Sequence, residues 1–120
     1  MAKVLVIDDS SFQRKIISGV LTQHGYEVIL KENGKEGLEH ALQEKPDLIF
    51  SDLLMPEYDG FWLLEQLKSQ NLSIPVIVLT SDIQKTTQER CLGLGAVSIL
   101  NKPVNKEQVI ATVRMILGNP

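Results

Sequence analysis

The 120-residue chain has one cysteine, Cys91, so it cannot form an internal disulfide, and nothing in its cysteine content points to an oxidising compartment. It has no excess of basic residues either. A formal net charge of -3, with no basic block, argues against nucleic acid as the main partner. No apolar run is long enough for a signal peptide or a membrane span, since the first one, Val4–Ile7, stops at Asp8. We therefore expect a cytoplasmic protein that does not insert into a membrane.

The chain also lacks the features that divide a sequence into parts: internal repeats, linkers and low-complexity segments. Its 43% hydrophobic and 22% charged residues are typical of a folded globular protein. A chain of this length suits one domain with one core, so we expect a single domain over residues 1–120. If the chain is complete, no residues remain for a DNA-binding or catalytic output domain.

Short apolar runs alternate with segments whose apolar residues recur at helical spacing. Strands are predicted at residues 4–7, 26–30, 47–53, 74–79 and 97–100. Helices are predicted after N-cap signals at Ser10-Ser11, Asn33 and Asn105, from about Phe61, and over residues 85–94. This alternation is typical of an α/β fold with a parallel sheet and helices on both faces.

Among doubly wound folds, the flavodoxin-like strand order 2-1-3-4-5 fits best. The runs at 4–7, 47–53 and 74–79 read as strands buried on both faces, whereas residues 26–30 alternate partly and suit a sheet edge. In this arrangement ligands bind beyond the carboxyl ends of the strands, where the winding reverses between the first and third strands.

Polar residues at the predicted strand ends should meet on that edge. The first strand delivers Asp8 and Asp9, the third Asp52, the fourth Thr80 and the fifth Lys102. Three converging carboxylates repel one another unless a cation lies between them, and Mg²⁺ prefers such oxygen ligands. We expect Asp9 and Asp52 to bind Mg²⁺ directly and Asp8 to act through water.

A phosphoryl group held at the same ion would make Asp52 the nucleophile, because a carboxylate can accept phosphate as an acyl phosphate. Lys102 would supply a second cation, and the Thr80 hydroxyl could donate a hydrogen bond to a phosphoryl oxygen. The competing interpretation is that each of these residues only caps its own loop.

The chain resembles the receiver domain of the two-component response regulators, the CheY-like proteins, over essentially its whole length. The residues that carry the resemblance are Asp8-Asp9, Asp52 with Met55-Pro56 and Gly60, Thr80-Ser81, and Lys102-Pro103. As an ordered set they are highly specific. The chemotaxis regulator of this family is itself a standard example of the 2-1-3-4-5 order.

The resemblance implies a phosphorylation-activated switch. Asp52 would become a 4-aspartylphosphate by accepting phosphate from a sensor histidine kinase, a phosphotransfer protein or a small phosphodonor, and would lose it by self-dephosphorylation. The backbone carbonyl of Leu54 would complete the Mg²⁺ site, and the Lys102-Pro103 peptide would be cis. The output would be contact with a downstream target protein. A phosphorelay intermediate and a phosphate sink remain alternatives.

The resemblance also implies that Thr80 moves toward the phosphoryl group and shifts an output surface that includes Ile99 and Pro103. Relatives usually have a Tyr or Phe three residues before the lysine, whereas this chain has Ile99. Isoleucine has no ring to rotate. We therefore expect backbone shifts in the loops after Thr80 and Lys102 to carry the output.

Three other functions compete with this one. A flavodoxin-like nucleotide or flavin binder needs a Gly-rich phosphate loop after the first strand, but Asp8-Asp9-Ser10-Ser11 has no glycine. A hydrolase with an aspartate nucleophile usually has an Asp-x-Asp pair there, and Asp8 and Asp9 are adjacent. A receiver-like module that binds partners without phosphate would not need Asp52, Lys102 and the acidic pair together.

Overall fold

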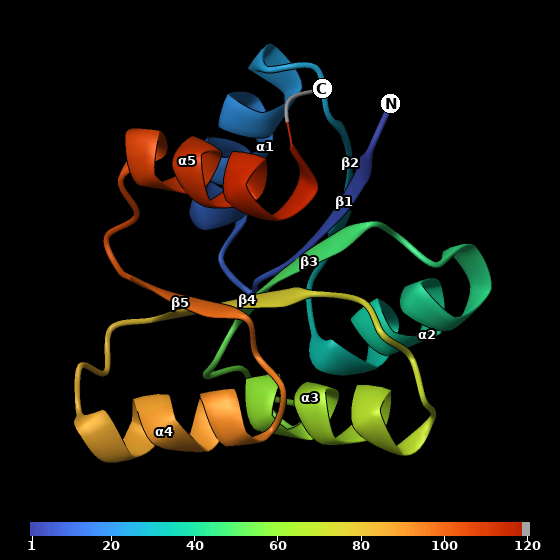
Figure 1. Ribbon diagram of the computed structural model, residues 1–120, viewed down its shortest axis with the longest axis vertical. Helices are drawn as coiled ribbons and strands as arrows, with labels where there is room; N and C mark the ends of the chain where they lie inside the picture. Colours follow the sequence, from blue (N-terminus) through green and yellow to red (C-terminus); the bar gives the residue numbers. More distant parts are fainter. Residues whose placement is uncertain (119–120) are drawn as a thin grey trace.

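The computed structural model describes residues 1–118 and forms one five-stranded parallel sheet flanked by five helices (Figure 1). The strands are β1 Lys3–Ile7, β2 Glu27–Lys31, β3 Leu48–Asp52, β4 Val76–Thr80 and β5 Ser98–Asn101. The helices are α1 Ser11–Gln23, α2 Gly34–Glu44, α3 Gly60–Ser69, α4 Lys85–Gly93 and α5 Lys106–Leu117.

The strand order is β2-β1-β3-β4-β5, which confirms the predicted topology. Every residue of β3 and β4 is buried, as continuous apolar strands in the middle of a parallel sheet should be. β2 lies at one edge and is only partly buried. The winding therefore reverses between β1 and β3, as expected.

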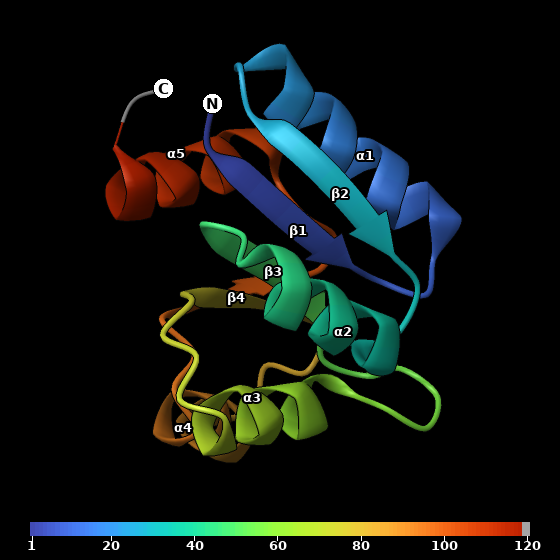
Figure 2. The same ribbon diagram turned by 90° about the vertical axis from the view of Figure 1, so that its right-hand side faces the viewer.

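Alternate residues of the strands point to opposite faces of the sheet and pack into two separate apolar clusters. On β1, Val4 and Val6 face the layer of α1 and α5, while Leu5 and Ile7 face the layer of α2, α3 and α4. Figures 1 and 2 show these two layers on opposite sides of the sheet. Cys91 is fully buried in the second cluster, so it is a core residue. No helix within residues 1–118 combines the length and apolarity needed to cross a bilayer.

Most helices start at a side chain that caps them. The side chains of Ser10, Asn33, Asp59 and Asn105 each accept the backbone N–H three residues further on. The caps at Ser10, Asn33 and Asn105 were predicted, whereas the cap at Asp59 was not. α4 differs, because its N-cap residue Gln84 makes no such bond.

The predicted boundaries are wrong by one or two residues at several strands. Tyr26 lies outside β2, and its ring is buried in the core near α1 and α5. The fourth strand begins at Val76 rather than Ile74. Glycine is the residue most common in a left-handed helix C-cap, and the two glycines near the end of α4 differ: Gly95 has the left-handed backbone (φ +108°), whereas Gly93 is still helical.

Candidate functional site

The acidic residues meet because β1 and β3 are neighbours. Ile7 pairs with Ser51, so the residues that follow, Asp8 and Asp52, emerge side by side at the carboxyl edge of the sheet. Asp8, Asp9 and Asp52 offer carboxylate oxygens that all lie within 4.8 Å of one another. Asp8 is fully buried and Asp52 nearly so, whereas Asp9 is exposed. The predicted convergence of the three carboxylates is therefore present.

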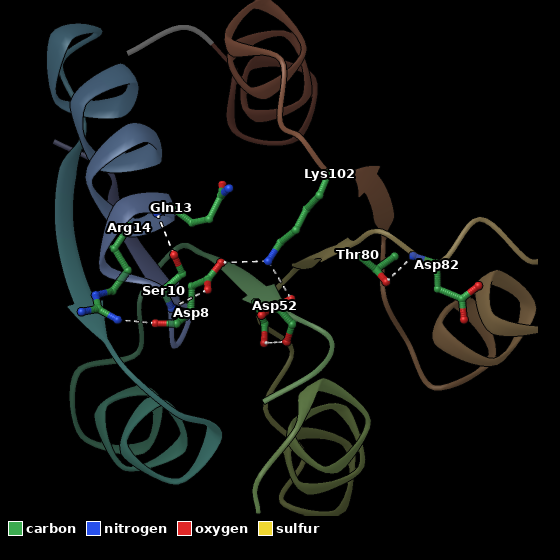
Figure 3. A network of polar contacts seen from close by, with 9 residues as sticks. Asp8, Ser10, Gln13, Arg14, Asp52, Thr80, Asp82 and Lys102 are labelled. Atoms are coloured by element: carbon green, nitrogen blue, oxygen red, sulfur yellow. Dashed lines mark hydrogen bonds and ion pairs between the residues drawn. The ribbon is translucent and has the colours of Figure 1, made fainter. Parts of the chain in front are cut away.

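Lys102 reaches the same cluster from the end of β5, across the end of β4 (Figure 3). Its Nζ lies 3.0 Å from Asp52 Oδ1 and 3.4 Å from Asp8 Oδ2. The peptide that joins it to Pro103 is cis, as the resemblance implied. One partly buried ammonium thus faces two buried carboxylates.

Hydrogen bonds to both its side chain and its backbone hold Asp8 in place. Its Oδ1 accepts the Ser10 backbone N–H at 2.9 Å, and its carbonyl accepts a hydrogen bond of 2.5 Å from the Arg14 guanidinium. Arg14 also lies 3.8 Å from Glu32. Sequence reasoning missed Arg14, because no periodicity or motif indicates that a side chain will donate a hydrogen bond to a backbone carbonyl six residues earlier.

The other oxygen of Asp8 supports a cation site. Asp8 Oδ2 is buried and makes no hydrogen bond within the described residues, although Lys102 Nζ lies 3.4 Å away. The three carboxylates and one ammonium leave a net formal charge of -2 in a largely buried cluster. A buried carboxylate oxygen without a hydrogen bond is costly, and a hard divalent ion would satisfy it. The residues present therefore fit Mg²⁺.

The electrostatics of the cluster appear in two pKa shifts. Burial raises the pKa of Asp52 to about 6, with further increases from Asp8 and Asp9 that the ammonium of Lys102 only partly offsets. Burial would lower the pKa of Lys102, but the carboxylates of Asp52 and Asp8 outweigh it and raise that pKa. Negative charge is in excess here.

The loop after Asp52 is held close to the cluster by Gly60. The Gly60 N–H donates to the Leu53 carbonyl at 2.8 Å, and a Cβ on Gly60 would lie 2.9 Å from the Asp52 carbonyl oxygen. This approach therefore requires glycine. Leu54 lies in the loop between Asp52 and Gly60. Its side chain is exposed, and its carbonyl accepts no hydrogen bond within residues 1–118. That carbonyl is free to serve as a ligand.

Thr80 lies at the same edge but is engaged elsewhere. It is buried at the end of β4, and its Oγ1 accepts the Asp82 backbone N–H at 3.0 Å. In Figure 3 it lies apart from the Asp52–Lys102 pair, with its hydroxyl beside Asp82. Five site residues were predicted at the strand ends. Asp8, Asp9, Asp52 and Lys102 lie together in the structure, whereas the Thr80 hydroxyl is bonded to Asp82.

Ile99 and Pro103, predicted to belong to an output surface, flank Lys102 on the chain. Ile99 is half-buried and packs on the apolar cluster beneath α2, α3 and α4. Pro103 is exposed. An aliphatic side chain packed in this way has no ring that could alternate between inward and outward positions.

Comparison with known proteins gives concordant matches. Residues 4–114 match the family "Response regulator receiver domain". Protein PilH of Pseudomonas aeruginosa is 36% identical over 98% of this chain and 99% of its own. The regulator PhoP of Bacillus subtilis is also 36% identical, but the chain spans only 48% of its length. Chemotaxis protein CheY4 of Vibrio cholerae superposes with a TM-score of 0.91 at 34% identity, over 98% of this chain and 99% of CheY4. None of these matches favours a nucleotide or flavin binder.

Proposed function

The chain belongs to the receiver domain family of two-component response regulators, and from this premise we propose that it is a switch phosphorylated on Asp52. The observation that carries the proposal is the position of Asp52, a buried carboxylate 3.0 Å from Lys102 and beside Asp8 and Asp9. A structural cap would need neither a partly buried ammonium nor two further carboxylates.

We propose that the cofactor is Mg²⁺, held by the carboxylates of Asp8, Asp9 and Asp52 and by the Leu54 carbonyl. Asp9 and Asp52 would be direct ligands, with Asp8 acting through water. When bound, the ion neutralises the excess negative charge and the charge of the phosphoryl oxygens. The hydrogen-bond-free Asp8 Oδ2 and the free Leu54 carbonyl support this ligand set.

The chain's own residues then have defined tasks. A carboxylate oxygen of Asp52 forms a bond to phosphorus as the P–N bond of a phosphohistidine breaks, and the departing imidazole keeps the electron pair. The pKa of Asp52, raised to about 6 in the metal-free protein, leaves the carboxylate mainly ionised at neutral pH, and a bound cation favours this charged form further. Lys102 neutralises charge on the phosphoryl oxygens, and the Thr80 hydroxyl donates to one of them after leaving Asp82.

The test is the addition of phosphate to the purified protein from a small acyl phosphate with Mg²⁺, followed by intact-mass spectrometry. We expect the wild type to gain one phosphoryl group, and Asp52→Asn to gain none. Asp47→Asn is the matched control, because Asp47 lies just before the same strand at its other end and is exposed. Modification of Asp52→Asn, or none of the wild type, would contradict the proposal.

We further propose that the domain, over residues 1–120, is cytoplasmic, that a sensor histidine kinase or a phosphotransfer protein is the donor, and that a downstream target protein reads the phosphorylated state. Signal transfer would involve the surface that includes Thr80, Ile99 and Pro103. A phosphorelay role or a phosphate sink would use the same chemistry. Capture of partners by Asp52→Ala and by wild type treated with Mg²⁺ and beryllium fluoride distinguishes these roles, because a target should be retained only by the treated wild type.

A further inference from the structure

α4 is the helix least firmly attached to the rest of the domain. Of its nine residues only Cys91 is buried, whereas α3 and α5 each bury four. Its N-cap residue, Gln84, provides no side-chain hydrogen bond, unlike the caps of the other four helices. The first turn of α4 therefore lacks the side-chain cap that the other four helices have.

Asp82 holds it from two residues before the cap. Its Oδ1 accepts the Gln84 backbone N–H at 2.9 Å, and its Oδ2 accepts the Thr87 hydroxyl at 2.7 Å. These two bonds lower the pKa of the Asp82 carboxyl, as expected for a carboxylate that accepts hydrogen bonds in its charged form. Asp82 thus replaces the missing cap and reaches into the first turn of the helix.

The same residue contacts the candidate site through its backbone. The Asp82 N–H donates to Thr80 Oγ1 at 3.0 Å, so Thr80, Asp82 and Thr87 form one continuous chain of hydrogen bonds (its first bond is drawn in Figure 3). None of the other four capping residues forms a hydrogen bond with Thr80 in the described part of the chain. Among the helix starts in the described residues, the start of α4 is the one tied to Thr80, whereas the start of α1 is tied to Asp8 through the Ser10 N–H.

We propose that Asp82 is a positioning residue that couples the orientation of the Thr80 hydroxyl to the first turn of α4. When the hydroxyl turns toward Asp52, the Asp82 N–H loses its acceptor. The loop that carries Asp82 is then held only by the side-chain bonds to Gln84 and Thr87, and the start of α4 loosens. Conversely, the bond to Thr87 resists that rotation, since coupling between two sites is reciprocal.

This inference rests on the proposed function only where it concerns the phosphoryl group. The link between Thr80 and α4 exists in the unmodified protein. It also offers a route from the site to α4 that does not use Ile99, which has no ring to report the position of Thr80. The coupling can therefore be tested separately from phosphorylation.

The first test measures amide hydrogen exchange by NMR in the metal-free, unmodified protein. Thr80→Val removes the acceptor for the Asp82 N–H with little change of shape. We expect about fivefold faster exchange at Gln84 and Gln88, with the amides of α5 as the internal reference. Thr87→Val should do the same and should also speed exchange at Asp82. Thr86→Val is the matched control, because Thr86 is exposed and makes no bond to Asp82.

The two threonine variants test the link independently of each other. If Thr80→Val leaves Gln84 and Gln88 exchanging as in Thr86→Val, the coupling is wrong. Should Thr80→Val fold poorly, Thr87→Val tests the same link through the Asp82 amide. If the Asp82 amide of Thr87→Val exchanges at the same rate as in the control Thr86→Val, the proposal is overturned.

The second test adds Mg²⁺ and beryllium fluoride, a mimic of the phosphoryl group, and measures its apparent affinity. Because Thr87→Val weakens the resistance to Thr80 rotation, we expect it to bind the mimic several-fold more tightly than Thr86→Val. Equal affinities would overturn the coupling to the phosphoryl state. If the wild type binds no mimic at all, the proposed function fails, and the link through Asp82 is then tested by hydrogen exchange alone.

Discussion

The two helices on either side of β5 in the sequence are attached to the domain in opposite ways. α5 contributes three buried residues, Val109, Ile110 and Val113, to the cluster it shares with α1, whereas α4 buries only Cys91 and depends on hydrogen bonds at its start. The carboxylates of the charged cluster lie at the carboxyl ends of β1 and β3, whose residues are almost all buried. A rigid site beside one firmly packed helix and one lightly attached helix is an arrangement in which a local change can move one helix while leaving the rest in place.

The largest expected effect tests the packing difference directly. Ile110→Ala in α5 removes a buried side chain and should lower the free energy of unfolding by about 3 kcal/mol. Leu92→Ala in α4 removes a side chain that is 51% exposed and should change it by less than about 0.5 kcal/mol. Urea denaturation measures both. Similar losses would show that α4 is packed as firmly as α5.

The next effect concerns the charged cluster. Lys102→Met leaves Asp8 and Asp52 buried without their cation and should destabilise the metal-free protein by about 2 kcal/mol at pH 7.5. This is below the value for a fully buried pair, since Lys102 is partly exposed and Asp52 can take up a proton. Lys106→Met, at the exposed first residue of α5, is the control and should have little effect. Thermal unfolding measures these changes in stability, and Mg²⁺ should restore part of the stability lost in Lys102→Met. If the unfolding temperature of metal-free Lys102→Met equals that of the wild type, the ammonium contributes little.

The pKa of Asp52 gives a smaller effect with a definite sign. Its pKa is raised to about 6 in the folded protein, above its ordinary value of 3.8, so the folded state holds the proton more tightly than the unfolded state. Stability therefore falls as the pH rises from about 4 to about 6 and then stays lower, by about 1–2 kcal/mol. Asp52→Asn removes this cost.

In the absence of divalent ions, Asp52→Asn should thus be more stable than the wild type at pH 7.5, and the difference should vanish near pH 4. Urea denaturation at the two pH values measures it. Adding Mg²⁺ should stabilise the wild type more than the variant, because Asp52 is a proposed ligand. A difference independent of pH would mean that Asp52 ionises in the folded protein as readily as in the unfolded chain.

The firmly packed part of the molecule is also the part that could be predicted from the sequence. Buried parallel strands read as continuous apolar runs, and the polar residues that end them, such as Asp8 and Asp52, must share one edge of the sheet. That logic predicted the topology and the meeting of the carboxylates with Lys102. The strand limits were harder to predict, because an apolar residue such as Tyr26 can be buried without belonging to a strand.

The contacts that could not be predicted are those made by single hydrogen bonds. The bond from Arg14 to the Asp8 carbonyl, and those from Thr87 to Asp82 and from Asp82 to Thr80, follow no periodicity. The sequence marked Thr80 as a donor to phosphate, but the loop geometry that turns its hydroxyl toward Asp82 depends on the start of α4. Prediction was therefore weakest for single side-chain hydrogen bonds, at the buried Asp8 as well as at the start of α4.

The smallest expected effect probes the remaining attachment of α4. The Arg90 guanidinium lies over the ring of Phe61 in α3, with its carbon 3.8 Å from the ring centroid. A cation–π contact at an exposed position contributes about 0.5–1 kcal/mol, so a double-mutant cycle of Arg90→Met and Phe61→Leu should give a coupling energy of that size. Arg114→Met in α5 serves as the control for loss of a positive charge. Amide exchange in the second half of α4 should rise in Arg90→Met, while α5 stays unchanged. A coupling energy near zero would leave Asp82 and Cys91 as the main attachments of α4, and would make the helix still more responsive to Thr80.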